Sequence, residues 1–196
     1  PAHQAVQKEA AAQGWVLTAI PDCATPTYTA LLNGNGTLCS AVIHMDDAKL
    51  FANFSPKIEN FTLCIVSANL PSIAALSVNR PIWADCVSVE KCGRLKPFLN
   101  RLDLVKANLD ELAVLANLAV VDPCVNAIHT AVLAIRESSC VTGEAISVSF
   151  LVTCGKSGLV VLVTQKDNVS TVSTFSDPLM KINSVETNTH IITSFQ

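Results

Sequence analysis

From residue 61 onward, short apolar runs of strand length alternate with amphipathic stretches of helix length. The strand-like runs cover residues 63–68, 82–85 and 102–106, and helical patterns follow them from Pro71, Ser88 and Leu109. Alternation of this kind predicts parallel strands joined by right-handed helical crossovers. We therefore expect a mostly parallel, doubly wound α/β sheet with helices on both faces.

The alternation changes towards the end of the chain. Asp122-Pro123 predicts the N-cap and first turn of another helix, with Val125, Ile128, Val132 and Ile135 on one face. The apolar runs 147–153 and 159–164 are separated by only five residues, which is too short for a crossover. We expect these two runs to pair antiparallel at one side of the sheet, followed by an irregular tail over residues 166–196.

The amino-terminal part has a different pattern. A short helical stretch ends at Gly14, and strand-like runs at 27–32 and 37–44 flank the turn sequence Asn33-Gly-Asn-Gly36. Such a turn between two β-type runs predicts a hairpin. The predicted organisation is a single partial domain over residues 1–196, with a hairpin at 27–45 and an α/β core at 61–165.

Composition excludes several classes of function. Charged residues make up 15% of the 196 residues, against about 25% in an average globular chain. No uninterrupted apolar run approaches the roughly 18 residues of a membrane span, so no membrane association is expected. The net charge of -3, without a cluster of basic residues, argues against a nucleic-acid partner.

The eight cysteines allow two interpretations. A secreted, disulfide-bonded domain is one, but the chain shows no secretory signal. Cys64, Cys86 and Cys154 lie within apolar runs, where a free thiol acts as a small hydrophobic side chain, and no CxxC pair suggests zinc. We therefore expect reduced cysteines and a cytoplasmic location.

Polar residues follow the ends of the predicted parallel strands. They are Asn69, Asp85, Lys106, Asn108 and the segment Thr153 to Gly158. Carboxyl ends of parallel strands meet at one edge, which is where ligands bind in open α/β sheets. Each residue alone is also explained as a cap or turn: Asn108 and Glu111 have the spacing of a reciprocal helix cap. Both a binding cleft and simple capping remain possible at this edge.

Four short motifs at this edge carry a resemblance. They are SANLP at 67–71, ADCVSVEKC at 84–92, KANLDEL at 106–112 and VTCGKSGLVV at 152–161. Their order and spacing resemble the ribokinase-like (PfkB-type) sugar and nucleoside kinases, and pseudouridine kinases most closely. The resemblance spans about residues 15–178, and it likens the hairpin at 27–45 to the lid that closes over the sugar.

The resemblance implies a role for each residue at the edge. Asn69, Asp85 and Tyr28 would contact the substrate, a small sugar or nucleoside. The ATP site would contain Lys106, Asn108, Thr153, Gly155 and Gly158, and Glu111 would hold Mg²⁺ through water. The implied reaction is ATP- and Mg²⁺-dependent phosphorylation of a hydroxyl group, with pseudouridine as the preferred acceptor.

One departure from the family concerns catalysis. The family's Gly-Ala-Gly-Asp segment, which supplies an anion hole and the catalytic aspartate, does not occur among the 196 residues. No catalytic residue is therefore assigned, and impaired phosphoryl transfer is expected. The alternative is a non-catalytic binding or subunit-interaction module derived from such a kinase. Because the chain has few charged residues, a homo-oligomer or an aggregation-prone chain is also expected.

Overall fold

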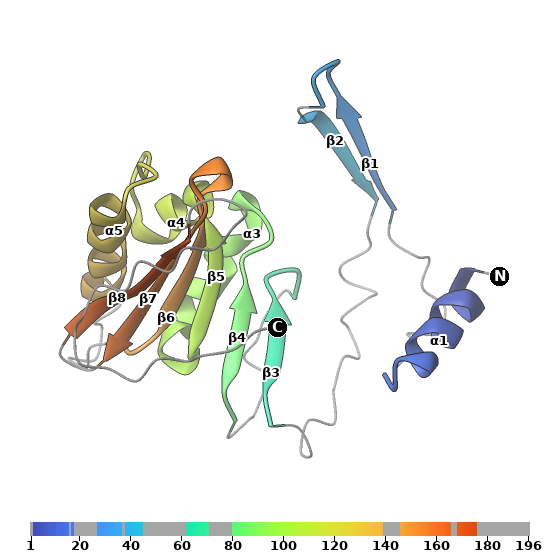
Figure 1. Ribbon diagram of the computed structural model, residues 1–196, viewed down its shortest axis with the longest axis horizontal. Helices are drawn as coiled ribbons and strands as arrows, with labels where there is room; N and C mark the ends of the chain where they lie inside the picture. The colour runs from blue at the N-terminus through green and yellow to red at the C-terminus, as the bar shows by residue number, and fades with distance from the viewer. Residues whose placement is uncertain are drawn as a thin grey trace. The chain divides into compact units, whose positions relative to one another are not determined.

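The computed structural model describes residues 2–15, 17, 27–36, 38–44, 62–70, 80–138, 146–165 and 168–175 (Figure 1). The chain divides into two compact units, Pro1–Phe54 and Ser55–Gln196. The predicted helix from Pro71 lies outside the described residues.

The first unit contains a helix and a hairpin. Helix α1 covers Ala2–Ala12, and strand β1 (Thr27–Leu32) pairs antiparallel with strand β2 (Leu38–His44). Tyr28 lies opposite Ile43, and both side chains are more than half exposed. The predicted hairpin is confirmed, and its role as a lid stays a prediction.

The second unit is built on a six-stranded sheet. In spatial order the strands are β3 (Cys64–Ser67), β4 (Ile82–Asp85), β5 (Leu104–Asn108), β6 (Ser149–Thr153), β7 (Leu159–Gln165) and β8 (Asn168–Phe175). Strands β3 to β6 run parallel, while β7 pairs antiparallel with both β6 and β8. The predicted parallel sheet with antiparallel strands at one side is confirmed.

Short helical segments connect these strands. They are α3 (Val89–Cys92), the 3-10 helix η1 (Gly93–Arg101), α4 (Leu109–Ala116), α5 (Val125–Ser138) and the 3-10 turn η2 (Gly155–Ser157). Helices α4 and α5 pack against each other, and Ile128, Val132 and Ile135 of α5 are buried as their spacing predicted. Together with the buried face of the sheet they form one core.

Three boundaries differ from the sequence prediction. Strand β5 begins and ends two residues later than expected, so Asn108 is both its last residue and the cap of α4. Helix α5 begins at Val125 because Asp122 is used in a tight turn, where its carbonyl accepts from the Cys124 N–H at 2.8 Å. The predicted irregular tail is wrong over Asn168–Phe175, where two valines and two Ser-Thr pairs lie in strand β8.

The sheet has one covered face and one open face among the described residues. Val105, Phe150 and Leu162 point into the core and are fully buried. On the opposite face, Ile65 is 71% exposed and its register partner Trp83 is 37% exposed. Strand β3 is also the outermost strand of the described sheet, so apolar surface and an unpaired strand edge coincide there.

This open face leads to a prediction about association. We expect the chain to form dimers or larger assemblies, and Ile65→Thr, which keeps a β-branched side chain, to weaken that association. Light scattering across a concentration series measures the effect. A monodisperse parent mass near 20.8 kDa at high concentration contradicts the prediction.

The junction between β5 and α4 gives a second prediction. Replacing Asn108 by alanine removes the side chain that caps α4, so the free energy of unfolding should fall by about 1 kcal/mol without any ligand. Chemical denaturation measures this change, with Asn100→Ala, at an exposed asparagine in η1, as the matched control. Equal stability of the Asn108 and Asn100 variants would show that the cap contributes nothing.

Candidate functional site

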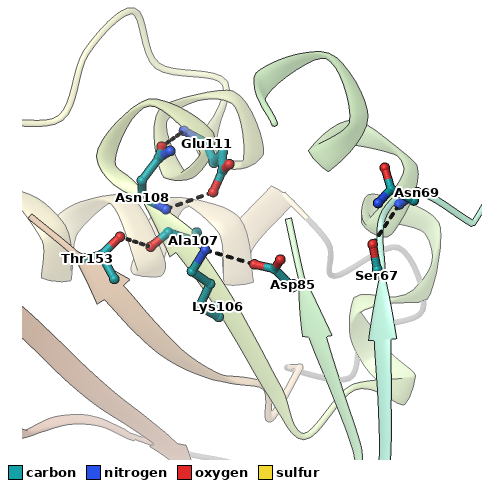
Figure 2. Close-up of polar contacts among 8 residues, drawn as sticks. All are labelled: Ser67, Asn69, Asp85, Lys106, Ala107, Asn108, Glu111 and Thr153. Carbon is teal, nitrogen blue, oxygen red and sulfur yellow. Dashed lines mark hydrogen bonds and ion pairs between the residues drawn. The ribbon is translucent and has the colours of Figure 1, made fainter. Parts of the chain in front are cut away.

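The polar residues singled out by sequence do gather at the carboxyl edge of the sheet. Asp85 and Lys106 are register partners on β4 and β5, and Asn108 and Thr153 are register partners on β5 and β6. Asn69 follows the end of the neighbouring strand β3. Figure 2 shows these side chains at the ends of adjacent strands. Their shared location is confirmed, and their roles stay predictions.

Asp85 and Lys106 form an ion pair across two strands. Lys106 Nζ lies 2.9 Å from Asp85 Oδ1, an oxygen that has no other partner among the described residues. The hydrogen bond to Asp85 raises the pKa of Lys106, so the ammonium stays charged at neutral pH. Both side chains are about two-fifths exposed, which keeps the cation within reach of an anionic ligand.

Asn108 and Glu111 form a reciprocal cap at the start of α4 (Figure 2). The Glu111 N–H donates to Asn108 Oδ1 at 2.8 Å, and the Asn108 N–H donates to Glu111 Oε2 at 2.8 Å. The structural interpretation of this spacing is therefore correct. It still leaves Asn108 Nδ2 and Glu111 Oε1 without a hydrogen bond to any described residue.

Of these two groups, only Glu111 Oε1 can take part in holding a metal ion. The part of the chain that the structure describes contains no cluster of three or more His, Cys, Asp or Glu residues suited to a metal ion. One carboxylate oxygen beside a helix N-terminus fits Mg²⁺ only when the ion keeps most of its water and is held mainly by phosphate oxygens. The contact of Glu111 with Mg²⁺ through water stays a prediction.

The turn after β6 provides backbone groups at the same edge. Thr153 Oγ1 donates to Ala107 O at 3.5 Å, which ties the ends of β6 and β5 together. Gly155 has φ +57°, and a side chain there would meet no atom within 4 Å, so the space above it is open. Gly158 has φ 93° and ψ -135°, a conformation that in practice only glycine adopts. Turn geometry alone therefore explains Gly158, while the space above Gly155 can admit a ligand.

Asn69 is held by two basic residues that sequence reasoning missed. Lys91 Nζ donates to Asn69 Oδ1 at 2.7 Å, and Arg94 Nη1 donates to the carbonyl oxygens of Ala68 and Asn69 at 3.2 Å. Lys91 and Arg94 are three residues apart, spanning the end of α3 and the start of η1. That spacing puts two side chains on one face of a helical segment. It is the sequence signal from which a shared contact of Lys91 and Arg94 could have been predicted.

Two thiols lie beneath this edge. Cys86 and Cys92 are fully buried, and burial together with the charge of Glu111 raises the pKa of both. They therefore remain protonated and belong to the core. Five of the described cysteines have free thiols, in agreement with the predicted reduced state: Cys64, Cys86, Cys92, Cys124 and Cys154.

Tyr28, the remaining predicted substrate residue, lies on β1 in the first unit. Its proposed position over the substrate stays a prediction.

Among the described residues, no helix has the length and apolar character needed to cross a membrane.

Several known proteins that are similar to this chain are kinases. No family model matches the sequence. A pseudouridine kinase of Arabidopsis thaliana is 29% identical over 109 residues, which cover 49% of this chain and 29% of that protein. Among solved structures, ribokinase from Thermotoga maritima has a TM-score of 0.64 at 13% identity, covering 93% of this chain and 58% of that chain.

A second solved structure is that of ribokinase from Cryptococcus neoformans in complex with ADP. It has a TM-score of 0.56 at 13% identity, and the match covers 90% of this chain and 60% of that chain. The chain thus spans less than two thirds of the length of each of these three proteins. The chain has the ribokinase-like fold of sugar and nucleoside kinases, as a partial domain, and is similar in sequence to a pseudouridine kinase.

Proposed function

We propose that this chain forms the phosphate-binding part of a ribokinase-like kinase that transfers phosphate from ATP to a hydroxyl group of a sugar or nucleoside. Pseudouridine is the favoured acceptor, because the curated relative is a pseudouridine kinase. The observation that carries the proposal is the convergence of Lys106, the capped start of α4 and the Thr153 to Gly158 turn at one sheet edge.

Each of these groups suits a phosphate chain. The first turn of α4 presents backbone N–H groups, which attract anions. Lys106 adds a charged donor, although Asp85 neutralises part of its charge. Because Asp110 and Glu111 are negative in the same turn, a phosphate needs a counter-ion there. Mg²⁺, when bound, would supply that neutralisation, with Glu111 Oε1 accepting a hydrogen bond from its water.

The 196 residues lack one part of this chemistry. They contain seven glycines, none of which forms the Gly-Ala-Gly-Asp segment that the family resemblance leads us to expect. A base that accepts the hydroxyl proton and a set of donors for the developing charge are both needed for rapid transfer. The proposal for this polypeptide alone is therefore ligand binding with impaired transfer.

An alternative from another class rests on the open sheet face. Ile65 and Trp83 expose apolar surface beside the outermost described strand, which suits contact with another chain. The alternative is a non-catalytic binding or subunit-interaction module that keeps part of the nucleotide site. A cytoplasmic location and self-association remain part of the proposal under both alternatives.

The proposal is tested by measuring how changes in the Asp85–Lys106 ion pair alter nucleotide affinity. We expect weak binding of Mg-ATP by calorimetry, with Lys106→Met lowering the affinity about three- to tenfold through loss of one charged hydrogen bond. Asp85→Asn should hold or raise the affinity, since it releases Lys106 from its partner. Lys8→Met, on the exposed surface of α1, is the control. If the parent and the three variants bind Mg-ATP with equal affinity, Lys106 does not contact the nucleotide.

Transfer is tested separately. The purified 196-residue chain should phosphorylate pseudouridine at a negligible rate, because the Gly-Ala-Gly-Asp segment to which the resemblance assigns the base and the anion hole does not occur in this sequence. A coupled assay for ADP release measures the rate. Turnover in the ordinary enzyme range of roughly 1 to 1,000 per second would contradict the expectation and point to a base elsewhere in the chain.

A further inference from the structure

Asn69 is fixed by hydrogen bonds on three sides. Its N–H donates to Ser67 Oγ at 3.1 Å, its carbonyl oxygen accepts from Arg94 at 3.2 Å, and its side-chain Oδ1 accepts from Lys91 Nζ at 2.7 Å. These contacts join the end of β3 to α3 and η1. The side chain of Asn69 is partly buried, so the amide cannot turn freely.

Lys91 determines which way the amide faces. An ammonium group has three donors and no acceptor, so only Oδ1 of the carboxamide can satisfy it. The assignment of oxygen and nitrogen in Asn69 therefore follows from the hydrogen-bond network. Nδ2, the other end of the amide, has no partner among the described residues. It remains available for a ligand.

We propose that Lys91 is a positioning residue that makes Asn69 a pure hydrogen-bond donor towards the substrate. This inference rests on the proposed function, in which Asn69 contacts the sugar or nucleoside. An asparagine that is free to flip can donate or accept, whereas Asn69 with Oδ1 held by Lys91 offers only its two N–H groups. The substrate atom opposite it must then be an acceptor.

A strained turn in the backbone before α3 helps to place Lys91. Val87 has φ +66°, which is strained for a β-branched residue, and the Ser88 N–H donates to Cys86 O at 2.7 Å across it. This tight turn leads directly from β4 into α3, whose four residues include Lys91. Lys91 of α3 and Arg94 of η1 in turn contact the end of β3.

The donor role of Asn69 restricts which substrate atom can face it. A hydroxyl group facing Asn69 would accept through its oxygen and would donate its own proton elsewhere. An ether or carbonyl oxygen at that position should bind as well as a hydroxyl, because both accept. A protonated amine at that position should not bind, because both partners would then be donors.

Three variants test the role of Lys91, with binding of pseudouridine and of Mg-ADP measured by calorimetry. Lys91→Met keeps the aliphatic stem but frees the amide, so pseudouridine affinity should fall about three- to tenfold. Lys91→Arg keeps donors and should restore part of it. Asn69→Asp replaces the donor by an acceptor and should weaken pseudouridine binding at least as much. Mg-ADP affinity should not change in any of them.

Lys96→Met is the matched control. Lys96 Nζ donates to Asn117 Oδ1 at 2.6 Å, so this variant breaks a similar lysine–asparagine contact at the end of α4. It should leave pseudouridine affinity unchanged. If the parent binds pseudouridine and Lys91→Met or Asn69→Asp binds it equally well, the donor role is overturned while the proposed function stands. If the parent binds Mg-ADP but not pseudouridine, the proposed substrate fails and the inference fails with it.

Discussion

The reciprocal cap between Asn108 and Glu111 is the contact on which the arrangement of the sheet edge depends. It ends β5 and begins α4 at the same residue, with no loop between them. Glu111 is 2% exposed, so its carboxylate is buried against the core and needs the Asn108 N–H as a partner. This contact sets the direction in which the free N–H groups at the start of α4 point.

Polar residues at this edge hold the structure together, and we propose that the same residues contact a ligand. Lys106 is paired with Asp85, Asn69 is held by Lys91, and Thr153 bonds to the backbone of β5. In each pair, one donor or acceptor of a polar side chain is used in a hydrogen bond or ion pair, and another donor or acceptor of that side chain remains for a ligand. A site of this kind is preorganised, because a ligand meets side chains whose orientation is already fixed.

Much of the fold could be predicted because it depends on local pattern. Buried strands such as Phe150 to Val152 and the helix face with Ile128 and Val132 follow from apolar spacing. The cap at Asn108 also followed from spacing. Strand β8 could not be found in this way, because its two valines, Val169 and Val172, are separated by a Ser-Thr pair and form neither an alternating pattern nor a continuous apolar run. The contact between Lys91 and Asn69 depends on residues 22 positions apart and on a strained turn at Val87.

The central claim is that the carboxyl edge of β5 and β6 binds a nucleotide. A titration of the ¹⁵N-labelled chain with Mg-ADP, followed by NMR, tests it most directly. The account predicts that the largest shift changes fall on the backbone amides of Asn108, Leu109, Gly155 and Gly158, at the edge formed by the start of α4 and the turn after β6. Changes confined to the opposite ends of the strands, near Ile82 and Leu104, would contradict it, as would a spectrum unaltered at millimolar nucleotide.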